Sequence, residues 1–316
     1  MTGQPLPSKR AGRLVVLGGA GKAGRVGEVF LVGAGPGDPE LLTVKALRLL
    51  GEADVVLHDR LTPQPVLDLA GAKARLIDVG KRKSRHTLPQ DDINRLLVAL
   101  ALEGLKVVRL KGGDPFLFGR GGEELEACRA AGVVCHVVPG VSAGLAAGAA
   151  AGAPLTHRGL AQAVTFVTGH AASGGEPELD WASLARANQT VVVYMGLTTA
   201  RMIAARLIQA GRRGSTPVAV VEGASLETER RIVTTLSGLS EAVRDLDGPA
   251  ILIIGEVVAL ADQHPDGGAV DKWNRRGRGE GAEIAEGQGL SASSAPSLRS
   301  PRLSLPAYRP GTGARR

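Results

Sequence analysis

Three glycine-rich segments are the parts of this 316-residue sequence whose residue types best suit ligand binding. They span 33–39, 111–124 and 139–143, and each comes directly after a run of apolar residues. Glycine permits positive φ and lets a ligand approach the backbone closely. The first two segments also share the triplet Gly-Asp-Pro. Ligands of open α/β sheets bind beyond the carboxyl ends of the strands, so we predict that the three segments form one site.

Alternating strand and helix patterns predict the elements that carry these segments. Predicted strands cover 29–33, 54–58, 75–79, 106–110 and 133–138, then 163–168, 190–195, 217–222 and 250–254. Predicted helices cover 39–50, 63–70, 89–103, 121–131, an Ala/Gly-rich stretch to about 151, 180–187, 199–210 and 239–245. Asp38 and Pro39 suit an N-cap and a first helical position.

The order of these elements predicts an α/β fold with two α/β domains. Five strands with helices between them indicate a mostly parallel five-stranded sheet in an N-terminal domain, 28–140. Shorter strands and fewer crossovers, with a further extended segment around 228–236, indicate a mixed sheet in a C-terminal domain, 141–264.

The net charge of +7 belongs to the two ends of the chain. Residues 1–27 carry five basic and no acidic groups, and residues 265–316 carry nine basic and five acidic groups, which leaves −2 for the middle. We interpret the first segment as a basic, disordered extension and the second as a disordered low-complexity tail. The core is therefore not expected to bind nucleic acid. A binding protein that acts through its basic tails remains an alternative.

The two cysteines, Cys128 and Cys135, are too few for a disulfide framework and lack the spacing of metal ligands. We expect free thiols, no metal and a reducing, cytoplasmic environment. No apolar stretch approaches the ~20 residues that a membrane span requires, so no membrane partner is expected. The run Leu14–Leu17 is too short for a signal peptide.

A match to G-x-G-x-x-G at 19–24 does not predict a nucleotide site. That motif needs a following helix, whose N-terminus meets the pyrophosphate. Here the next predicted strand begins about four residues later, so no helix fits, and we reject a nicotinamide-dependent function.

The second glycine-rich segment carries a longer and more specific pattern. Gly-Gly-Asp-Pro-Phe-Leu-Phe-Gly-Arg-Gly-Gly-Glu-Glu at 112–124, with Val-Gly-Ala-Gly-Pro-Gly-Asp-Pro at 32–39, resembles the tetrapyrrole methylase family, and within it the uroporphyrinogen-III C-methyltransferases. Further matches lie at His58–Leu61, Val79–Arg82, Pro154–Arg158, Thr168–His170 and Tyr194–Leu197. The resemblance covers about 28–260.

The resemblance implies a homodimeric enzyme that binds S-adenosylmethionine in a cleft between its two domains. It implies methylation of uroporphyrinogen III at C2 and C7, through precorrin-1 to precorrin-2. A later corrin-ring methylase of the same fold is the alternative enzyme. The first 27 residues are too few for the dehydrogenase/chelatase domain that some family members carry, so we expect none.

The same resemblance assigns candidate site residues. Its cofactor-contacting positions are Pro36, Gly112, Gly113, Asp114, Leu117, Ser142, Ala143, Met195 and Ala224. Asp114 would accept hydrogen bonds from the ribose hydroxyls, and Leu117 and Met195 would pack on the adenine or the methionine chain. Asp59 matches the proton acceptor and Lys81 the proton donor, which suits a reaction in which the pyrrole must shed a proton once its carbon accepts the methyl group.

A tetrapyrrole that carries several carboxylates needs cations around it, although the core is acidic. We predict that Arg60, Arg82, Lys111 and Arg120 bind these carboxylates, because they follow strands and arginine suits bidentate recognition. The sequence departs from the family pattern at three places. His58 stands where Tyr is usual, Glu222–Ser225 replaces the common Glu-Asn-Gly-Thr, and the usual Gly before Thr235-Leu236 is missing.

Overall fold

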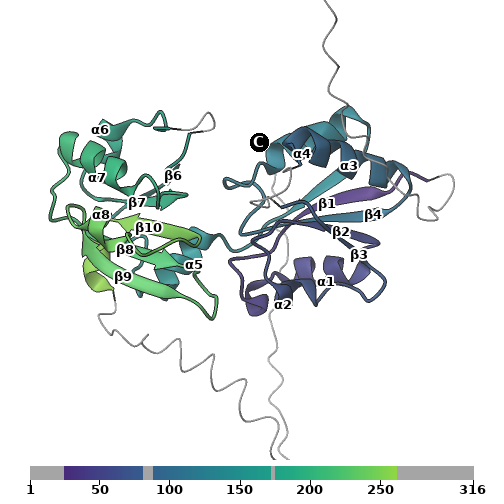
Figure 1. Ribbon diagram of the computed structural model, residues 1–316, viewed down its shortest axis with the longest axis horizontal. Helices are drawn as coiled ribbons and strands as arrows, with labels where there is room; N and C mark the ends of the chain where they lie inside the picture. Colours follow the sequence, from purple (N-terminus) through teal and green to yellow (C-terminus); the bar gives the residue numbers. More distant parts are fainter. Residues whose placement is uncertain (1–24, 81–87, 172–174, 262–316) are drawn as a thin grey trace, which may run out of the picture. The chain divides into compact units, whose positions relative to one another are not determined.

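The computed structural model describes residues 25–80, 88–171 and 175–261 (Figure 1). Its first sheet has the strand order β3-β2-β4-β1-β5, and every pairing in it is parallel. These strands are β1 (Glu28–Gly33), β2 (Val55–His58), β3 (Arg75–Asp78), β4 (Lys106–Lys111) and β5 (Val134–Val138). The predicted parallel sheet is therefore confirmed.

Helices cover both faces of the first sheet (Figure 1). They are α1 (Val44–Glu52), α2 (Gln64–Leu67), α3 (Gln90–Leu102) and α4 (Gly121–Ala130). Successive side chains of a strand point to opposite faces. Accordingly, Val29 and Leu31 of β1 pack in a core with α3 and α4, whereas Phe30 and Val32 pack in a core with α1 and α2. Burial on both faces explains why β1 is apolar from Val29 to Val32, after the exposed Glu28.

The predicted helix over 39–50 was wrong in its boundaries. Asp38 caps a separate 3₁₀ helix, η1 (Pro39–Leu41), by accepting a hydrogen bond from the Glu40 N–H at 2.9 Å. The chain is then extended, and the Thr43 hydroxyl accepts from the Ala46 N–H at 3.1 Å to begin α1. A second good N-cap residue divides what periodicity alone reads as one helix. Gly51 lies inside α1 rather than after it.

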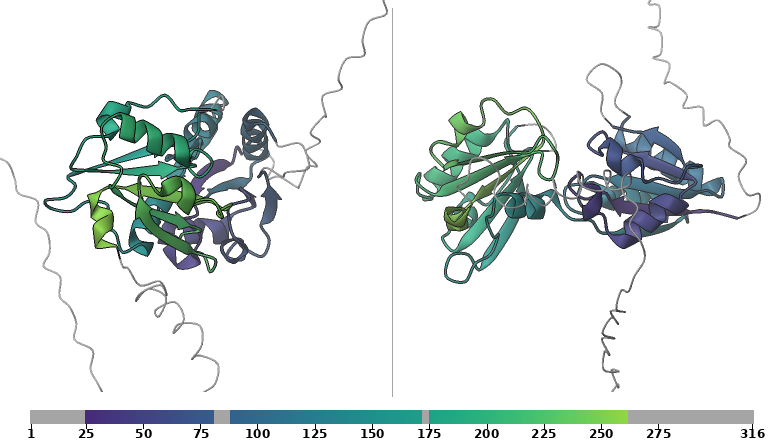
Figure 2. Two further views of the ribbon diagram at one scale, coloured as in Figure 1. Left: turned by 60° about the vertical axis from the view of Figure 1, so that its left-hand side comes forward. Right: turned by 90° about the horizontal axis from the view of Figure 1, so that it is seen from below.

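The second sheet is mixed, as predicted, with the order β6-β7-β10-β8-β9. Only β6 and β7 pair in parallel among the described strands of this sheet. The strands are β6 (Ala163–Thr168), β7 (Gln189–Tyr194), β8 (Pro217–Glu222), β9 (Arg230–Thr235) and β10 (Ala250–Ile254). In the further views of Figure 2, its teal and green strands form a sheet separate from the purple and blue first sheet.

The helices of this second part are mostly shorter than predicted. They are α5 (Ala143–Ala150), α6 (Trp181–Leu184), α7 (Ala200–Gln209), α8 (Leu239–Ala242) and the 3₁₀ helix η2 (Glu256–Leu260), which was not predicted. Helix α5 packs on one face of the sheet, and α6, α7 and α8 contribute to the core on the other. The chain passes from the first sheet to the second in the segment between β5 and α5.

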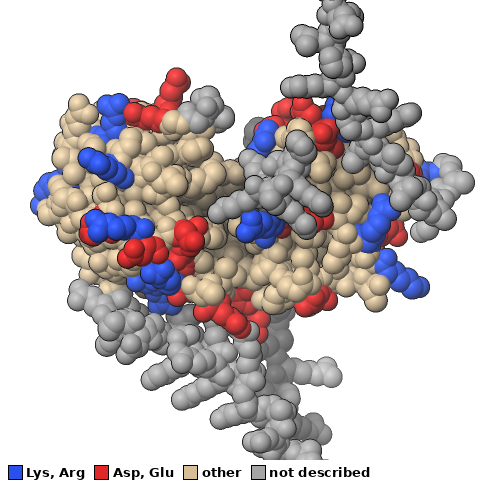
Figure 3. All heavy atoms as spheres, viewed as in Figure 1, with Lys and Arg blue, Asp and Glu red and all other residues tan. Residues whose placement is uncertain are grey.

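Charged side chains are dispersed over the described surface. On the face drawn in Figure 3, basic side chains lie beside acidic ones, and no continuous basic area forms there. Ion pairs of the described surface include Arg48–Glu52 and Arg206–Glu176. Within the described ranges, no helix has the length and apolar character needed to cross a membrane.

Candidate active site

The three glycine-rich segments meet at one edge of the first sheet. They follow β1, β4 and β5, which are neighbours in the order β4-β1-β5. Gly35 and Gly113 exchange two backbone hydrogen bonds of 3.2 and 2.7 Å. A Cβ added at Gly140 would lie 2.3 Å from the Gly113 carbonyl oxygen, so only glycine permits this approach. The predicted meeting of the three segments is confirmed.

The glycines at this edge fall into two kinds. Gly33 and Gly140 are packed against backbone, since a Cβ added at either would come within 2.6 Å of backbone atoms of the neighbouring segments. Gly112 and Gly113 are open. Among the described residues, a Cβ at Gly112 would meet only the Leu61 side chain, at 3.8 Å, and one at Gly113 would stay 3.7 Å or more from Ser142 and Ala143. Open glycines leave room for a ligand against their backbone, which suits the predicted cofactor contacts.

Asp114 joins two of the segments. Its carboxylate accepts hydrogen bonds from the Phe116 N–H at 2.8 Å and from the Gly140 N–H at 3.1 Å. A carboxylate offers about four acceptor positions, so these bonds leave acceptor capacity. Hydrogen bonding of Asp114 to ribose hydroxyls stays a prediction, and the structure adds a second role in holding the segments together.

Ser142 bonds to a residue that the sequence reasoning did not select. Its Oγ lies 2.5 Å from the hydroxyl of Tyr194, at the end of β7. The same hydroxyl accepts a hydrogen bond of 2.8 Å from the Gly144 N–H in the first turn of α5. Tyr194 therefore caps α5, whose own N-cap Ser142 makes no capping bond. Burial raises the pKa of Tyr194, which keeps it a neutral phenol. The family match at 194–197 was the sequence signal that could have identified Tyr194 as a site residue.

Met195 follows Tyr194 in an uncommon backbone conformation. Its φ is +54° and its side chain is half-exposed, which is unusual for a long apolar residue. Phe118 shares this φ of +54°, and its ring centroid lies 4.9 Å from that of Tyr194. Strained backbone of this kind concentrates at ligand sites. Leu117 and Ala143 pack against the core that contains Tyr194, and Ala224 is buried in it.

The loop that contains Ala224 contacts the first glycine-rich segment. The Asp38 N–H donates to the Ser225 hydroxyl at 3.1 Å. A Cβ added at Gly37 would lie 2.3 Å from the Leu226 side chain. Pro36 precedes this contact and is half-buried. Ser225, the last residue of the departure at Glu222–Ser225, thus accepts a hydrogen bond from the backbone two residues after Pro36.

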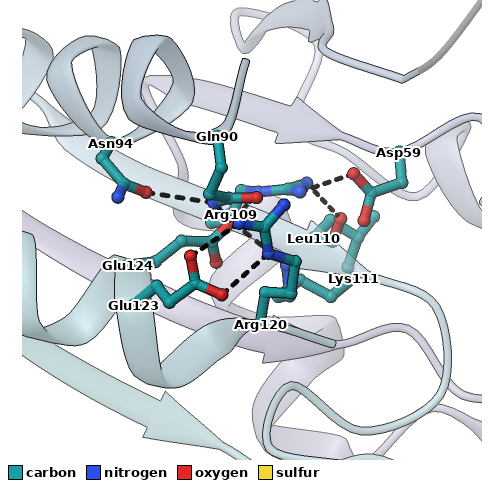
Figure 4. Close-up of polar contacts among 9 residues, drawn as sticks. All are labelled: Asp59, Gln90, Asn94, Arg109, Leu110, Lys111, Arg120, Glu123 and Glu124. Carbon is teal, nitrogen blue, oxygen red and sulfur yellow. Dashed lines mark hydrogen bonds and ion pairs between the residues drawn. The ribbon is translucent and has the colours of Figure 1, made fainter. Parts of the chain in front are cut away.

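Asp59 lies after β2, beside β4, with its side chain 31% exposed. Its Oδ1 accepts a hydrogen bond of 2.5 Å from Nη2 of Arg109 (Figure 4). Its sequence neighbour Arg60 is exposed. Lys81 and Arg82, the predicted proton donor and a predicted substrate ligand, lie outside the described residues.

Behind Asp59 is a buried group of charges from β4 and α4. Glu124 is 0% exposed, and its Oε1 accepts hydrogen bonds from Arg109 at 2.9 Å and from Lys111 at 3.1 Å. Burial alone would lower the pKa of Arg109, but the carboxylates of Glu124 and Asp59 raise it. Burial and the charge of Arg109 lower the pKa of Lys111 despite Glu124. Nothing in the sequence pattern distinguished Glu124 from Glu123.

The two remaining predicted substrate ligands differ in position. The side chain of Lys111 is 4% exposed and its ammonium group bonds Glu124, so contact with a substrate would require this pair to open. Arg120 is exposed and bonds Glu123 through two nitrogens at 2.8 and 2.7 Å. It precedes α4 with a φ of +58°. Both assignments stay predictions, and Arg120 has the more accessible side chain.

The cysteines are free thiols, as expected, with Cys128 buried and Cys135 half-buried. In the part of the chain that the structure describes, no three side chains of His, Cys, Asp or Glu gather as metal ligands would.

The chain was compared with known proteins. The family described as Tetrapyrrole (Corrin/Porphyrin) Methylases matches residues 28–240. The siroheme synthase of Chromobacterium violaceum is 49% identical over 269 residues, which are 84% of this chain and 56% of that protein. The siroheme synthase of Azotobacter vinelandii is 51% identical over 265 residues, which are 83% of this chain and 56% of that protein. The chain thus spans about half the length of these curated relatives.

Solved structures give the same result. A uroporphyrin-III C-methyl transferase from Thermus thermophilus, complexed with S-adenyl homocysteine, matches with a TM-score of 0.65 and 46% identity, over 74% of this chain and 100% of that one. The cobalt precorrin-4 methyltransferase CbiF matches with a TM-score of 0.66 and 30% identity, over 73% of this chain and 95% of that one. The chain therefore belongs to the tetrapyrrole (corrin/porphyrin) methylase family.

Proposed function

We propose that the chain is an S-adenosylmethionine-dependent methyltransferase that acts on uroporphyrinogen III at C2 and then C7, giving precorrin-1 and precorrin-2. The observation that carries the proposal is the match to the whole length of the Thermus thermophilus uroporphyrin-III C-methyl transferase at 46% identity. The match to the cobalt precorrin-4 enzyme is weaker in sequence, at 30%. Identity at this level over the whole Thermus thermophilus enzyme favours a shared substrate rather than a shared fold alone.

The described residues fit the methyl donor. Gly113 presents open backbone opposite Ser142 and Ala143, and Gly112 presents it near Leu61. Met195 is half-exposed and follows Tyr194, whose hydroxyl bonds Ser142. Leu117 adds an apolar wall, and Asp114 retains acceptor positions for hydroxyl groups. Pro36 and Ala224 belong to two loops that touch each other. In this proposal the cofactor is held mainly through backbone atoms, which explains why small residues dominate the set.

In this reaction the protein mainly orients the two substrates and transfers protons. When bound, S-adenosylmethionine supplies a methyl group already activated on sulfonium sulfur. A ring carbon of the substrate attacks that methyl, so a carbon–carbon bond forms as the sulfur–carbon bond breaks. The methylated ring carbon carries no hydrogen, so the positive charge gained with the methyl group is released as a proton from another position of the macrocycle. Asp59 accepts that proton, and Lys81 is the donor when a position of the macrocycle is protonated again.

Exposed cations would hold the substrate's carboxylates. Arg60 and Arg120 are exposed near the same edge of the sheet as Asp59, and Arg82 follows β3 in the sequence. Arg120 is already paired with Glu123, so the substrate must compete for it. We further propose a cytoplasmic homodimer with domains 28–140 and 141–264.

Methyl transfer from labelled S-adenosylmethionine to uroporphyrinogen III tests the proposal. Purified protein should convert the substrate into a red-fluorescent, doubly labelled product, with one S-adenosylhomocysteine released for each methyl transferred. Binding of S-adenosylhomocysteine without methylation of uroporphyrinogen III, but with methylation of a later precorrin, would favour the alternative enzyme. Absence of cofactor binding would favour a non-enzymatic protein that acts through its basic tails, with the steep salt dependence expected of such segments.

A further inference from the structure

Arg109 connects the protein interior to the proposed catalytic carboxylate. Its side chain is 2% exposed, and each nitrogen of the guanidinium has a different acceptor. Nε donates to Glu124 at 2.9 Å, Nη1 to the Leu110 carbonyl at 3.1 Å and Nη2 to Asp59 at 2.5 Å. A planar group bonded on three sides cannot turn without breaking at least two of these bonds.

Glu124 fixes the inner end of this arrangement. Its Oε1 receives Nε of Arg109, Nζ of Lys111 at 3.1 Å and Nε2 of Gln90 at 3.2 Å (Figure 4). These donors come from β4 and α3, so the carboxylate is held between two elements. A fully buried carboxylate with two buried cations has a strong penalty for any displacement that separates the charges. The orientation of Arg109 is therefore set from behind.

Asp59 is the exposed end of the same chain of charges. Its side chain is 31% exposed, whereas those of Arg109, Lys111 and Glu124 are at most 4% exposed. Arg109 binds Oδ1 only. Within the described residues Oδ2 accepts no hydrogen bond, so one oxygen is fixed and the other is available to take a proton. Two carboxylates and two cations also leave the group without net charge, so Arg109 is not needed as an isolated counterion for the substrate.

We infer that Arg109 is a positioning residue, which Glu124 orients from behind and which holds Asp59 with one carboxylate oxygen free to take the proton that the substrate sheds. The inference rests on the proposed function. It predicts that Arg109 contributes to catalysis only through Asp59. The residues that contact the cofactor are separate from this group, so cofactor affinity does not depend on it.

A double-mutant cycle tests this dependence, with rates of labelled methyl transfer measured at saturating S-adenosylmethionine and uroporphyrinogen III. Arg109→Met leaves Glu124 paired with Lys111 and Asp59 partly solvated, so the variant is expected to fold. We expect kcat to fall about 10- to 100-fold, with the KM for S-adenosylmethionine unchanged. In an Asp59→Ala background the same change should lower kcat by less than about twofold, because there is no carboxylate left to position.

The controls separate positioning from loss of structure. Arg212 is a second buried arginine, 6% exposed, that bonds the backbone carbonyls of Arg186, before β7, and of Gln189, its first residue. Arg212→Met should lower stability without changing kcat. If Arg109→Met does not fold, Arg109→Lys replaces it. This variant keeps the charge but loses the three-sided geometry, and it should lower kcat less than removal of Asp59 does.

Two results would overturn the inference. One is an equal fall in kcat for Arg109→Met with and without Asp59, and the other is an unchanged kcat in Arg109→Met. The wild-type reaction with uroporphyrinogen III is measured first. If the wild type does not methylate uroporphyrinogen III, both the proposed function and the proposed role of Asp59 are contradicted. If the wild type is active but the losses in kcat from Arg109→Met and Asp59→Ala are additive, the positioning role of Arg109 is contradicted and the proposed function is not.

Discussion

Buried charges are arranged differently in the two sheets. Next to the first sheet, Arg109 and Lys111 bond the buried Glu124, and the group reaches the surface at Asp59. Beside the second sheet, Arg212, which follows α7, donates to the carbonyls of Arg186 and Gln189. Hydrogen bonds from Arg212 satisfy buried backbone carbonyls, whereas a series of ion-paired side chains can fix the position of a reactive group such as the Asp59 carboxylate. The first arrangement therefore suits catalysis and the second suits stability.

Glu222 provides the acidic counterpart in the second sheet. It is 8% exposed, and its Oε1 accepts from the N–H groups of Asp247 and Gly248 at 3.1 and 2.7 Å. Its other oxygen lies 3.5 Å from the half-exposed Arg230. Glu124 instead depends on two buried cations. Removal of the charge should therefore have different consequences at the two glutamates.

The largest expected effect is loss of turnover in Asp59→Ala. The variant removes the proposed proton acceptor, so kcat should fall about 10²- to 10⁴-fold. Affinity for S-adenosylhomocysteine, measured by calorimetry, should stay within about twofold of wild type, because Asp59 is not among the proposed cofactor contacts. Normal methylation rates in this variant would remove Asp59 from the mechanism.

The next effect is on stability and compares Glu124→Gln with Glu222→Gln. At Glu124 the change leaves two buried cations short of a carboxylate, and we expect the free energy of unfolding to fall by about 3 to 5 kcal/mol. At Glu222 the amide oxygen can still accept backbone N–H bonds, so the expected loss is about 1 kcal/mol. Urea unfolding monitored by circular dichroism measures both. Equal losses would contradict the distinction between the two sheets.

A third comparison separates open from packed glycines. Gly112→Ala adds a methyl group where space is open, so stability should change by less than about 0.5 kcal/mol. The methyl would occupy proposed cofactor space, and the Kd for S-adenosylhomocysteine should rise about tenfold. Gly140→Ala places a methyl 2.3 Å from a carbonyl oxygen and should cost about 1 to 3 kcal/mol of stability. Unchanged affinity in Gly112→Ala would place the cofactor elsewhere.

The smallest effect is expected from Tyr194→Phe. The variant keeps the ring against Phe118 but removes the hydroxyl that bonds Ser142 and Gly144. Loss of these bonds should reduce the free energy of unfolding by about 1 kcal/mol. The KM for S-adenosylmethionine should rise a few fold while kcat is maintained, because Ser142 and α5 would be held less firmly. Steady-state kinetics with varied S-adenosylmethionine would show this, and a lower kcat at unchanged KM would contradict it.

The sequence by itself determined the α/β class, the two sheets and the meeting of the three glycine-rich segments. These features follow from local signals. Apolar runs define strands, glycines and prolines interrupt them, and parallel strands place their carboxyl ends at one edge. The family resemblance also followed from contiguous residues, above all 112–124. Helix boundaries were less certain, since Thr43 competes with Asp38 for the same helix start.

Only the tertiary structure decided which of the charged and polar residues work together. Asp59 and Arg109 are 50 positions apart, and they become neighbours because β2 pairs with β4. Glu124 and Glu123 are equivalent in the sequence, yet the turn of α4 buries the first and exposes the second. Tyr194 of β7 reaches Ser142, 52 positions away, because α5 packs on the sheet that contains β7. Burial and pairing depend on which elements pack together, and no local pattern of residues encodes that.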